Sequence, residues 1–507
     1  MPVDNLIDLR TALQPRGPAS RYLREAALID GKWTMAARTI EVRNPADDSR
    51  IGSVPDLTAD DMKRAIAGAR RALPQWKGLL PRQRGDLLLA WADAMLAAKR
   101  DLAALLTMEQ GKPLADAEGE IEYGASFLRW FSEEASRVYG EIIPSHLPHR
   151  KMMVQREALG VVGLVTPWNF PSAMLARKAA AALAAGCTVV AVPSAETPYS
   201  AIALAAIAQD VGIPAGVFSV LTGDAPMLVG ELCRDPHVRG LSFTGSTTVG
   251  RVLAAQCAPT LKRVSLELGG HAPFIVFPDV DVTAAAEAAV AAKFQTSGQD
   301  CLAANRIFVH RDIYPAFVTA FTTATGRLTV GAGTQPGVDL GPVINQRTFD
   351  KSADHVADAL AKGARLTTGG GRHDLGGLFI APTTLADVTP DRTIMHEETF
   401  GPVAALLPFD DEDAVVAEAN DSEYGLAAYL FTNDLSRAHR VADRLEYGMV
   451  AINTMRMTGA PIPFGGVKQS GLGREGSRHG IDEYTEVKYV CIDVEPAQSS
   501  ITVKKDQ

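Results

Sequence analysis

The run VVGLV at residues 161–165 and the chain that follows it decide the fold. Five consecutive apolar or small residues predict a buried β-strand. A helix is predicted over residues 173–185, a second apolar strand over 188–192, and a further helix and strand over 199–210 and 217–221. This alternation of strand and helix predicts parallel strands joined by crossover helices, and therefore a Rossmann-like α/β domain.

The flanking chain supplies further elements. Residues 57–139 have a helical pattern, in which Thr58 and Asp61 predict a capping box and Pro81 a second helix start. A second α/β stretch is predicted over residues 272–453. Two segments, 144–158 and the chain from Tyr484 on, alternate apolar and polar residues, which is typical of edge strands that pair outside their own domain. Residues 1–22 are expected to form a loosely held arm.

Bulk composition excludes several classes of protein. The chain has 507 residues, a net charge of −9 and five cysteines without a C-x-x-C pair. We therefore expect no disulfide framework, no metal site and no nucleic-acid partner. The sequence contains no H-E-x-x-H motif, no apolar signal region at the N-terminus and no apolar run long enough to cross a membrane. These features predict a cytoplasmic protein in a reducing compartment.

Cys301 is the cysteine whose surroundings point to chemistry. It follows the polar, glycine-containing loop that begins at Phe294, whereas Cys187, Cys233 and Cys257 lie in or beside apolar segments. Most cysteines are small buried hydrophobes, and those three fit that interpretation. A thiol at the end of a polar loop can instead meet a ligand and be activated by backbone N–H groups.

Two more residues fit the same chemistry. Glu267 stands between leucines and before Gly269-Gly270, a turn that could direct its carboxylate into a cleft as a general base. Asn169 lies in a proline-stiffened loop and offers a fixed amide to an oxyanion. The alternatives are a surface glutamate on an amphipathic strand and an asparagine that only makes a turn.

Six motifs together resemble the aldehyde dehydrogenase superfamily in order and spacing, over about residues 30–492. They are TPWNFP (166–171), FTGST (243–247), LELGG (266–270), F-x-x-x-G-Q-x-C (294–301), EETFGPV (397–403) and PFGGVKQSGLGREG (463–476). The last contains G-x-G-x-x-G, but no βαβ unit can follow it so near the C-terminus, so we interpret it as a loop near the substrate.

The resemblance implies a fold and a set of roles. It implies a cofactor-binding domain over 1–143 and 159–268, a catalytic domain over 269–470, and small β oligomerisation segments over 144–158 and 484–507. Cys301 would be the nucleophile and Glu267 the base that hydrolyses the thioester. Asn169 and the Cys301 N–H would form the oxyanion hole, with Lys178 and Glu475 supporting proton transfer. The expected cofactor-binding residues are Thr166, Pro167, Trp168, Pro193, Ser194, Glu196, Gly245, Ser246, Glu398 and Phe400.

The succinate-semialdehyde dehydrogenase subfamily is the most similar. There an arginine at the position of Arg177 binds the far carboxylate of the substrate, for which a planar guanidinium is suited; the alternative is a solvated helix arginine. Gln295 stands where a second arginine is usual, while Arg456 is new and Thr458 replaces a serine. Arg177, Gln295, Arg456 and Thr458 are thus the expected substrate-binding residues. Succinate semialdehyde is the main expectation, and glutarate semialdehyde, a sulfonated aldehyde and an uncharged aldehyde stay open.

The turn expected to bind adenosine departs from the family. Lys-Pro-Ala/Ser-Glu is usual, but here Val192 and Ala195 replace the lysine and the glutamate. Loss of the glutamate carboxylate removes a charge that would repel the 2′-phosphate, and so permits NADP. Loss of the lysine ammonium removes a positive charge that would attract the same phosphate, and so weakens the binding of NADP. Both NAD and NADP remain possible, and the lack of a cation tips the expectation slightly to NAD. Glu196 is a candidate to take over ribose binding.

Rival functions are weaker. A cysteine thioesterase or esterase without productive cofactor binding is supported only by the altered adenosine turn. CoA-acylating transfer does not need the base Glu267, and the intact set of Cys301, Glu267 and Asn169 argues against an idle binding protein. We expect a small-molecule aldehyde as substrate, no membrane partner, and a homodimer or homotetramer.

Overall fold

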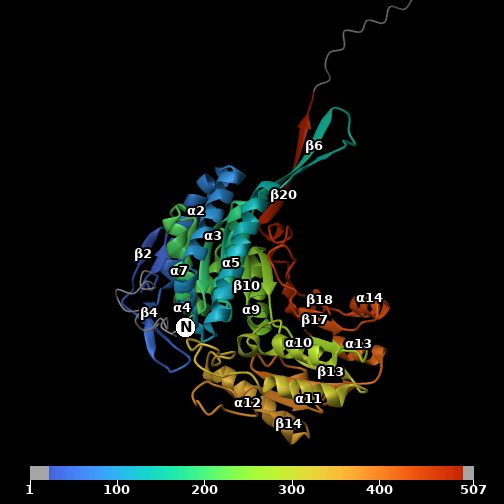
Figure 1. Ribbon diagram of the computed structural model, residues 1–507. Helices are drawn as coiled ribbons and strands as arrows, with labels where there is room; N and C mark the ends of the chain where they lie inside the picture. Colours follow the sequence, from blue (N-terminus) through green and yellow to red (C-terminus); the bar gives the residue numbers. More distant parts are fainter. Residues whose placement is uncertain (1–21, 495–507) are drawn as a thin grey trace, which may run out of the picture.

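Three sheets organise residues 22–494, which the structure, a computed structural model, describes (Figure 1). The first has eight strands in the order β19-β11-β10-β7-β8-β9-β1-β2. These are Ala27–Ile29 (β1), Lys32–Thr34 (β2), Val161–Thr166 (β7), Thr188–Pro193 (β8), Phe218–Val220 (β9), Val238–Thr244 (β10), Arg263–Glu267 (β11) and Gly471–Leu472 (β19). Strands β7 to β11 run parallel, which confirms the Rossmann-like prediction.

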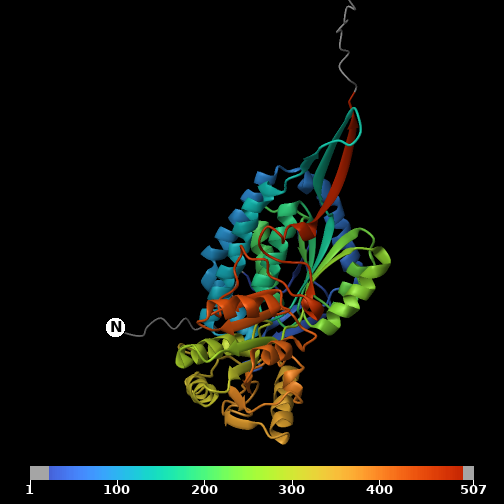
Figure 2. The same cartoon turned by 90° about the vertical axis from the view of Figure 1, so that its right-hand side faces the viewer.

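Helices cover both faces of this sheet, and the apolar runs follow from that (Figure 2). Val162 and Leu164 of β7 pack in the same apolar cluster as helices α3 to α7, whereas Val161 and Val165 pack with α2, α8 and α9. A strand buried on both faces has no polar side, so its sequence is continuously apolar. The helices are Ala59–Gly78 (α2), Pro81–Ala97 (α3), Lys99–Gln110 (α4), Leu114–Glu134 (α5), Pro171–Ala185 (α6), Pro198–Asp210 (α7), Ala225–Arg234 (α8) and Thr247–Cys257 (α9).

The local signals for these helices are confirmed. Thr58 and Asp61 form a capping box at the start of α2, and α3 begins at Pro81. Helix α6 begins at Pro171, two residues before the predicted start, because proline is well suited to the first helical position.

The second sheet has the order β14-β15-β16-β13-β12-β17-β18, parallel except for β14. Its strands are Ala272–Val276 (β12), Ala304–His310 (β13), Arg365–Thr368 (β14), Thr383–Ala386 (β15), Val403–Phe409 (β16), Ala427–Phe431 (β17) and Met449–Ile452 (β18). Five helices belong to this half: Val282–Phe294 (α10), Tyr314–Thr325 (α11), Gln346–Ala361 (α12), Glu412–Asn420 (α13) and Leu435–Arg444 (α14). The predicted second α/β stretch is therefore confirmed.

A small antiparallel sheet projects from the body (Figures 1 and 2). Its strands are Glu141–Ile143 (β5), Arg150–Ala158 (β6) and Thr485–Asp493 (β20), in the order β20-β6-β5. The two segments with alternating sequence are thus both strands, and they pair with each other. The third strand, β5, precedes the expected boundary at residue 144.

Smaller features complete the fold. Thr39–Arg43 (β3) and Arg50–Pro55 (β4) form a two-stranded sheet. The expected N-terminal arm, except for Tyr22, and residues 495–507 of the expected oligomerisation segment lie outside the described residues. No helix within residues 22–494 combines the length and the apolar character needed to cross a membrane.

Candidate active site

The carboxyl edge of the first sheet gathers most of the expected site residues. Strands β8 and β9 lie on one side of β7, and β10 and β11 lie on the other. Such a reversal of strand order opens a crevice at the carboxyl ends of the strands, where ligands bind in sheets of this kind. Thr166 ends β7, Pro193 ends β8, Gly245 follows β10 and Glu267 ends β11, so these four expected residues meet at one edge.

Cys301 reaches this edge from the loop between α10 and β13, in the other half. The backbone of Thr296, Ser297 and Gly298 is left-handed, with φ of 50°, 57° and 70°. A Cβ on Gly270 would lie 2.1 Å from the carbonyl oxygen of Cys301. Residues 268–270 run without a turn between β11 and β12, so the predicted Gly-Gly turn is not found, and the lack of a side chain at Gly270 lets the nucleophile loop pack directly against it.

The cysteines differ as expected. Cys187, Cys233 and Cys257 are buried, Cys491 is exposed, and Cys301 is half-buried. Burial raises the pKa of the Cys301 thiol well above its usual value, the carboxylates of Asp300, Glu398 and Glu267 add to the rise, and Arg177 opposes it. A thiol held in this way needs a neighbouring base to become a nucleophile.

Glu267 has the environment of a general base. Its side chain is buried, and neither carboxylate oxygen has a hydrogen-bond partner among the described residues. Burial, together with the charge of Glu475, raises its pKa well above the usual value, while Arg177 and Lys178 oppose the rise. The expectation of a carboxylate withdrawn from the surface is correct, and the alternative of a surface glutamate is wrong.

Arg177, Lys178 and Glu475 form one buried charge cluster. Nε of Arg177 lies 2.5 Å from Oε2 of Glu475, and Nζ of Lys178 donates to Oε1 of the same carboxylate. Lys178 also donates to Oγ of Ser242 at 3.0 Å. Every residue of α6 is buried, so the alternative of a solvated helix arginine is wrong for Arg177.

Asn169 is fixed by two neighbours. Its side-chain Nδ2 donates to the backbone carbonyl of Gln299 at 3.1 Å, and its backbone carbonyl accepts a hydrogen bond from Nζ of Lys112 at 2.7 Å. An amide nitrogen carries two hydrogens, so one remains for an oxygen formed beside Cys301.

A cavity of about 870 Å³ opens onto Cys301. All four expected substrate-binding residues, Arg177, Gln295, Arg456 and Thr458, line it. Its other walls include Tyr123, Phe170, Met174, Tyr429 and Phe464. Glu267 and Asn169 are not among the lining residues, so the structure brings the substrate residues to one cavity with the thiol and leaves the base and the amide outside its walls.

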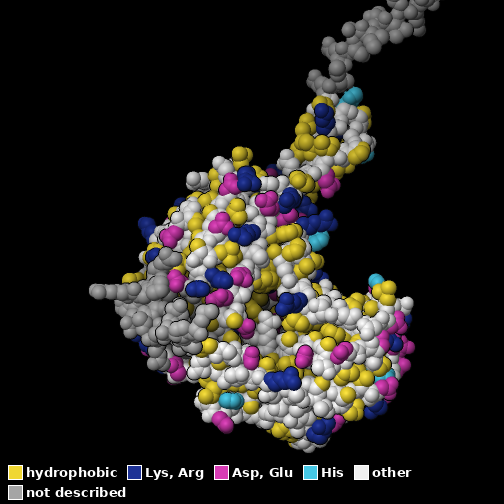
Figure 3. Space-filling view, in the orientation of Figure 1, with side chains coloured by type: hydrophobic (Ala, Val, Ile, Leu, Met, Phe, Trp, Pro, Cys, Tyr) yellow, Lys and Arg dark blue, Asp and Glu magenta, His cyan; other side chains and the backbone are white. Residues whose placement is uncertain are grey.

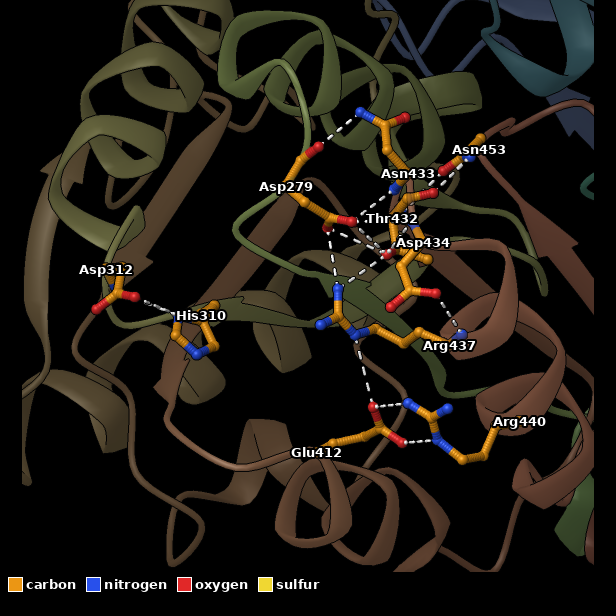
Figure 4. Close-up of polar contacts among 10 residues, drawn as sticks. All are labelled: Asp279, His310, Asp312, Glu412, Thr432, Asn433, Asp434, Arg437, Arg440 and Asn453. Atoms are coloured by element: carbon orange, nitrogen blue, oxygen red, sulfur yellow. Dashed lines mark hydrogen bonds and ion pairs between the residues drawn. The ribbon is translucent and has the colours of Figure 1, made fainter.

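The loop that carries Arg456 and Thr458 is tied down at its start (Figure 4). Asn453 has a left-handed backbone, with φ of 56°, and its amide accepts from N and donates to O of Thr432, at 2.9 and 2.8 Å. Oγ1 of Thr432 in turn donates to the carboxylate of Asp279 at 2.9 Å. A dense polar network therefore fixes the position from which the substrate loop departs.

The expected nicotinamide end suits a dinucleotide. Oε1 of Glu398 accepts from N of Gly270 at 3.0 Å, and burial raises the pKa of this carboxyl to about 7. The rings of Trp168 and Phe400 meet edge to face at 5.4 Å. Ser246 caps α9, whose first N–H groups can face a pyrophosphate.

The end of the site expected to bind adenosine suits a dinucleotide less well. Val192 and Ala195 offer no polar side chain there. N of Glu196 donates to Oγ of Ser194 at 3.3 Å, and the Glu196 carboxylate already accepts a hydrogen bond from Asn345. The chain can therefore hold a nicotinamide dinucleotide mainly through its pyrophosphate and nicotinamide ends.

Sequence reasoning missed three residues next to the site. Lys112 and Glu120 contact the loop and helix start around Asn169, and Tyr123 lies beside Arg177 and Thr458. Lys112 follows the end of α4 at Gly111, where a charged residue normally faces water, so only three-dimensional packing reveals its burial.

The model of the aldehyde dehydrogenase family matches residues 33–490. This chain belongs to that family. It is 53% identical to an aspartate-semialdehyde dehydrogenase (non-phosphorylating) of Halomonas elongata, over 93% of this chain and 96% of that protein. It is 50% identical to a succinate-semialdehyde dehydrogenase [NADP(+)] of Escherichia coli, over 93% and 97%. Other relatives at similar identity are named for glutarate semialdehyde and 3-sulfolactaldehyde.

A solved structure agrees with this membership. The crystal structure of a succinate-semialdehyde dehydrogenase from Burkholderia pseudomallei superposes with a TM-score of 0.93, at 50% identity, over 94% of this chain and 99% of that chain. The predicted aldehyde dehydrogenase-like fold is confirmed, and members of this family oxidise aldehydes with a nicotinamide cofactor.

The contact between Gly270 and Cys301 can be tested. We expect Gly270→Ala to lower the steady-state rate of aldehyde oxidation about 100-fold, because a Cβ at 2.1 Å from the Cys301 carbonyl must push the nucleophile out of place. Gly78→Ala is the matched control, since a Cβ there meets nothing within 4 Å. Equal activity of the two variants would contradict the assigned contact.

Proposed function

We propose that this aldehyde dehydrogenase oxidises a small semialdehyde that carries a second acidic group, with succinate semialdehyde as the main candidate. The observation that carries the proposal is the cavity that Cys301 lines together with three arginines, Arg177, Arg456 and Arg327, of which Arg327 lies 3.8 Å from Glu287. A guanidinium recognises a carboxylate or sulfonate through paired hydrogen bonds. The names of the relatives support the same class of substrate.

In the first step, Glu267 accepts the proton of the Cys301 thiol, and the sulfur attacks the aldehyde carbon to give a thiohemiacetal. The negative charge that forms on the carbonyl oxygen is stabilised by Nδ2 of Asn169 and the backbone N–H of Cys301. A nicotinamide cofactor held beside Trp168, Glu398 and Phe400 would supply the acceptor for the hydride of the former aldehyde carbon. Cys301 then carries the acyl group as a thioester.

In the second step, Glu267, which has passed the thiol proton on to Glu475 and Lys178, takes a proton from water, and the resulting hydroxide attacks the thioester. The carbon–sulfur bond breaks, and the acid leaves. Glu475 and Lys178 are proposed to pass the proton of Glu267 onward, since Glu475 interacts with both Glu267 and Lys178. The raised pKa of Glu267 makes it a stronger base in its ionised form.

Glu267→Gln separates the two steps. We expect hydrolysis of the thioester to become rate-limiting and steady-state turnover to fall at least about 100-fold, because an amide cannot remove a proton from water. In the parent enzyme, the hydrolysis rate should rise with pH through the raised pKa of Glu267, since only the carboxylate is active. Mass spectrometry of the intact chain should show an acyl adduct on the variant. Unchanged turnover and an unchanged pH profile would refute the base role.

Arg456 is proposed as the main anchor of the far acidic group. The charge of Arg177 is already matched by Glu475 at 2.5 Å, so it is less available to a substrate. Arg456 is exposed on the wall of the cavity, and Gln295 takes the place of the usual second arginine. Gln295 and Thr458 are proposed to donate further hydrogen bonds to the substrate.

Arg456→Met tests this anchor. We expect kcat/KM for succinate semialdehyde to fall about 10-fold to 100-fold and kcat/KM for propanal to change less than about threefold, because only the first substrate loses a charge-assisted hydrogen bond. Arg327→Met is the matched control, since Arg327 lines the same cavity and faces Glu287 at 3.8 Å. The values of kcat/KM for glutarate semialdehyde, a sulfonated aldehyde and aspartate semialdehyde then show which acidic group the parent enzyme prefers. Equal losses for propanal and the semialdehydes would contradict the proposed role.

We propose that NAD is slightly preferred to NADP. The turn after β8 carries no lysine or arginine of its own to meet a 2′-phosphate, although the charge of Arg347 acts on Glu196, and the ribose carboxylate of the family is replaced by Ala195. The expected binding residues are Thr166, Pro167, Trp168, Pro193, Ser194, Glu196, Gly245, Ser246, Glu398 and Phe400, and one oxygen of the Glu196 carboxylate already accepts from Asn345.

Ala195→Glu restores the ribose carboxylate and tests this turn. The variant should gain in kcat/KM with NAD and lose in kcat/KM with NADP, each by about 10-fold, since a carboxylate accepts from ribose hydroxyls and repels a phosphate. The absorbance of the reduced nicotinamide measures kcat/KM with each of the two cofactors. If the parent enzyme cleaves esters but gives no such absorbance with either cofactor, the alternative of a cofactor-independent cysteine esterase is favoured.

The projecting sheet is proposed to join copies of this chain into a homodimer or homotetramer. Its strands and their flanks expose large apolar side chains, which Figure 3 shows on the projecting arm. They are Tyr139, Ile142, Ile143, Leu147, Val487, Tyr489 and Ile492. Exposed apolar side chains beside an unpaired strand edge favour association. We retain the division into cofactor-binding, catalytic and oligomerisation segments, and the cytoplasm as the compartment in which Cys301 stays reduced.

A further inference from the structure

A buried ion pair next to the site has no part in the chemistry proposed so far. Nζ of Lys112 lies 2.7 Å from Oε2 of Glu120, and the two side chains are 1% and 0% exposed. Removing two charges from water costs free energy. A buried ion pair offsets this cost when further hydrogen bonds satisfy its remaining polar atoms. The contacts of both partners therefore indicate what the pair does.

Both partners hold the same stretch of backbone. Lys112 donates to the carbonyl of Asn169 at 2.7 Å, and its ammonium lies 3.9 Å from the centre of the Phe170 ring. Oε1 of Glu120 accepts from N of Ser172 at 2.9 Å and from N of Ala173 at 3.1 Å, in the first turn of α6. The pair thus binds the oxyanion loop on one side and the start of the following helix on the other.

Lys112 is itself held by both halves of the molecule. N of Leu114 donates to the carbonyl of Gly333 at 2.9 Å, and a Cβ on Gly333 would lie 2.3 Å from the carbonyl of Lys112. Gly333 belongs to the chain between α11 and α12, in the second half. The backbone of Lys112, whose ammonium holds Asn169, is therefore anchored to the same half of the molecule that carries Cys301.

We propose that Lys112 and Glu120 are positioning residues that hold the Asn169 amide where the oxyanion forms. The proposal rests on the oxyanion role of Asn169 proposed above. The backbone of Asn169 is fixed by Lys112, and its side chain is fixed by Gln299, two residues before Cys301. The main chain and the side chain of Asn169 are each held by one hydrogen bond, so Nδ2 keeps its place as charge develops on the substrate. The pair acts through Asn169 and does not touch the reacting atoms.

Lys112→Met removes the ammonium and keeps most of the side-chain stem. We expect the single-turnover rate of reduced-nicotinamide formation to fall about 10-fold to 100-fold, because a displaced oxyanion donor loses transition-state contact, while KM for the aldehyde changes less than about threefold. Glu120→Gln, which retains an oxygen for the two helix N–H groups, should give a smaller loss. It provides the measurement if Lys112→Met does not fold.

Lys262→Met is the matched control. Lys262 is also a buried lysine, and its Nζ donates to the carbonyls of Leu232, Asp235 and Val238, in a different part of the first half. This variant should lose thermal stability and keep its single-turnover rate within about twofold. A rate loss in Lys262→Met as large as that in Lys112→Met would show a general structural effect and overturn the proposal.

A double-variant cycle with Asn169→Ala completes the test. If Lys112 acts through Asn169, Lys112→Met should cause little further rate loss once Asn169 is alanine. Fully additive losses, or a shift of the pH profile of the first step in Lys112→Met, would overturn the proposal by showing an independent or electrostatic action. If Asn169→Ala alone leaves the rate unchanged, the oxyanion role in the proposed function has failed instead.

Discussion

The close approach of Gly270 to the backbone of Cys301 is the constraint on which the site depends. Gly270 lies in the chain that passes from β11 of the first sheet to β12 of the second, and Cys301 precedes β13, so the contact holds the nucleophile loop at the crossing between the two halves. A Cβ on Gly270 would come within 2.1 Å of the Cys301 carbonyl, and a Cβ on Gly298 within 2.3 Å of the carbonyl of Gly401. The absence of these two side chains lets the loop that carries Cys301 pack closely against the chain after Glu267 and against Gly401. Every residue with a proposed chemical role lies around this junction.

Much of the fold follows from the sequence because its signals are local. The apolar runs of β7 and β8 reflect burial on both faces of a parallel sheet, and Thr58, Pro81 and Gly186 mark helix ends through their own backbone preferences. Strand β5 was missed because three exposed residues have too little pattern to recognise. The start of α6 was placed two residues late because Pro171 was assigned to the preceding loop.

The residues of the site could be predicted only in part, because several of them come together through contacts between distant parts of the chain. The local sequence pointed to Cys301, Glu267 and Asn169, and the resemblance added Lys178 and Glu475. The residues expected to bind the substrate line one cavity with the thiol. The pairing of Arg177 with Glu475 could not be foreseen, since the two residues are far apart in the chain. Lys112 and Glu120 were not seen at all, because nothing in the sequence tells a buried ion pair from two charges in water.

Helix α6 also limits how an enzyme of this kind can change its substrate. Arg177 and Lys178 are consecutive on a helix without a single exposed residue, so a new side chain at either position disturbs the shared Glu475. The segment from Thr454 to Thr458 is largely exposed, and it departs from a base at Asn453 that is bonded to Thr432. Changes in substrate specificity are therefore expected mainly in that short loop, because its sequence can vary while the cluster of Arg177, Lys178 and Glu475 stays intact.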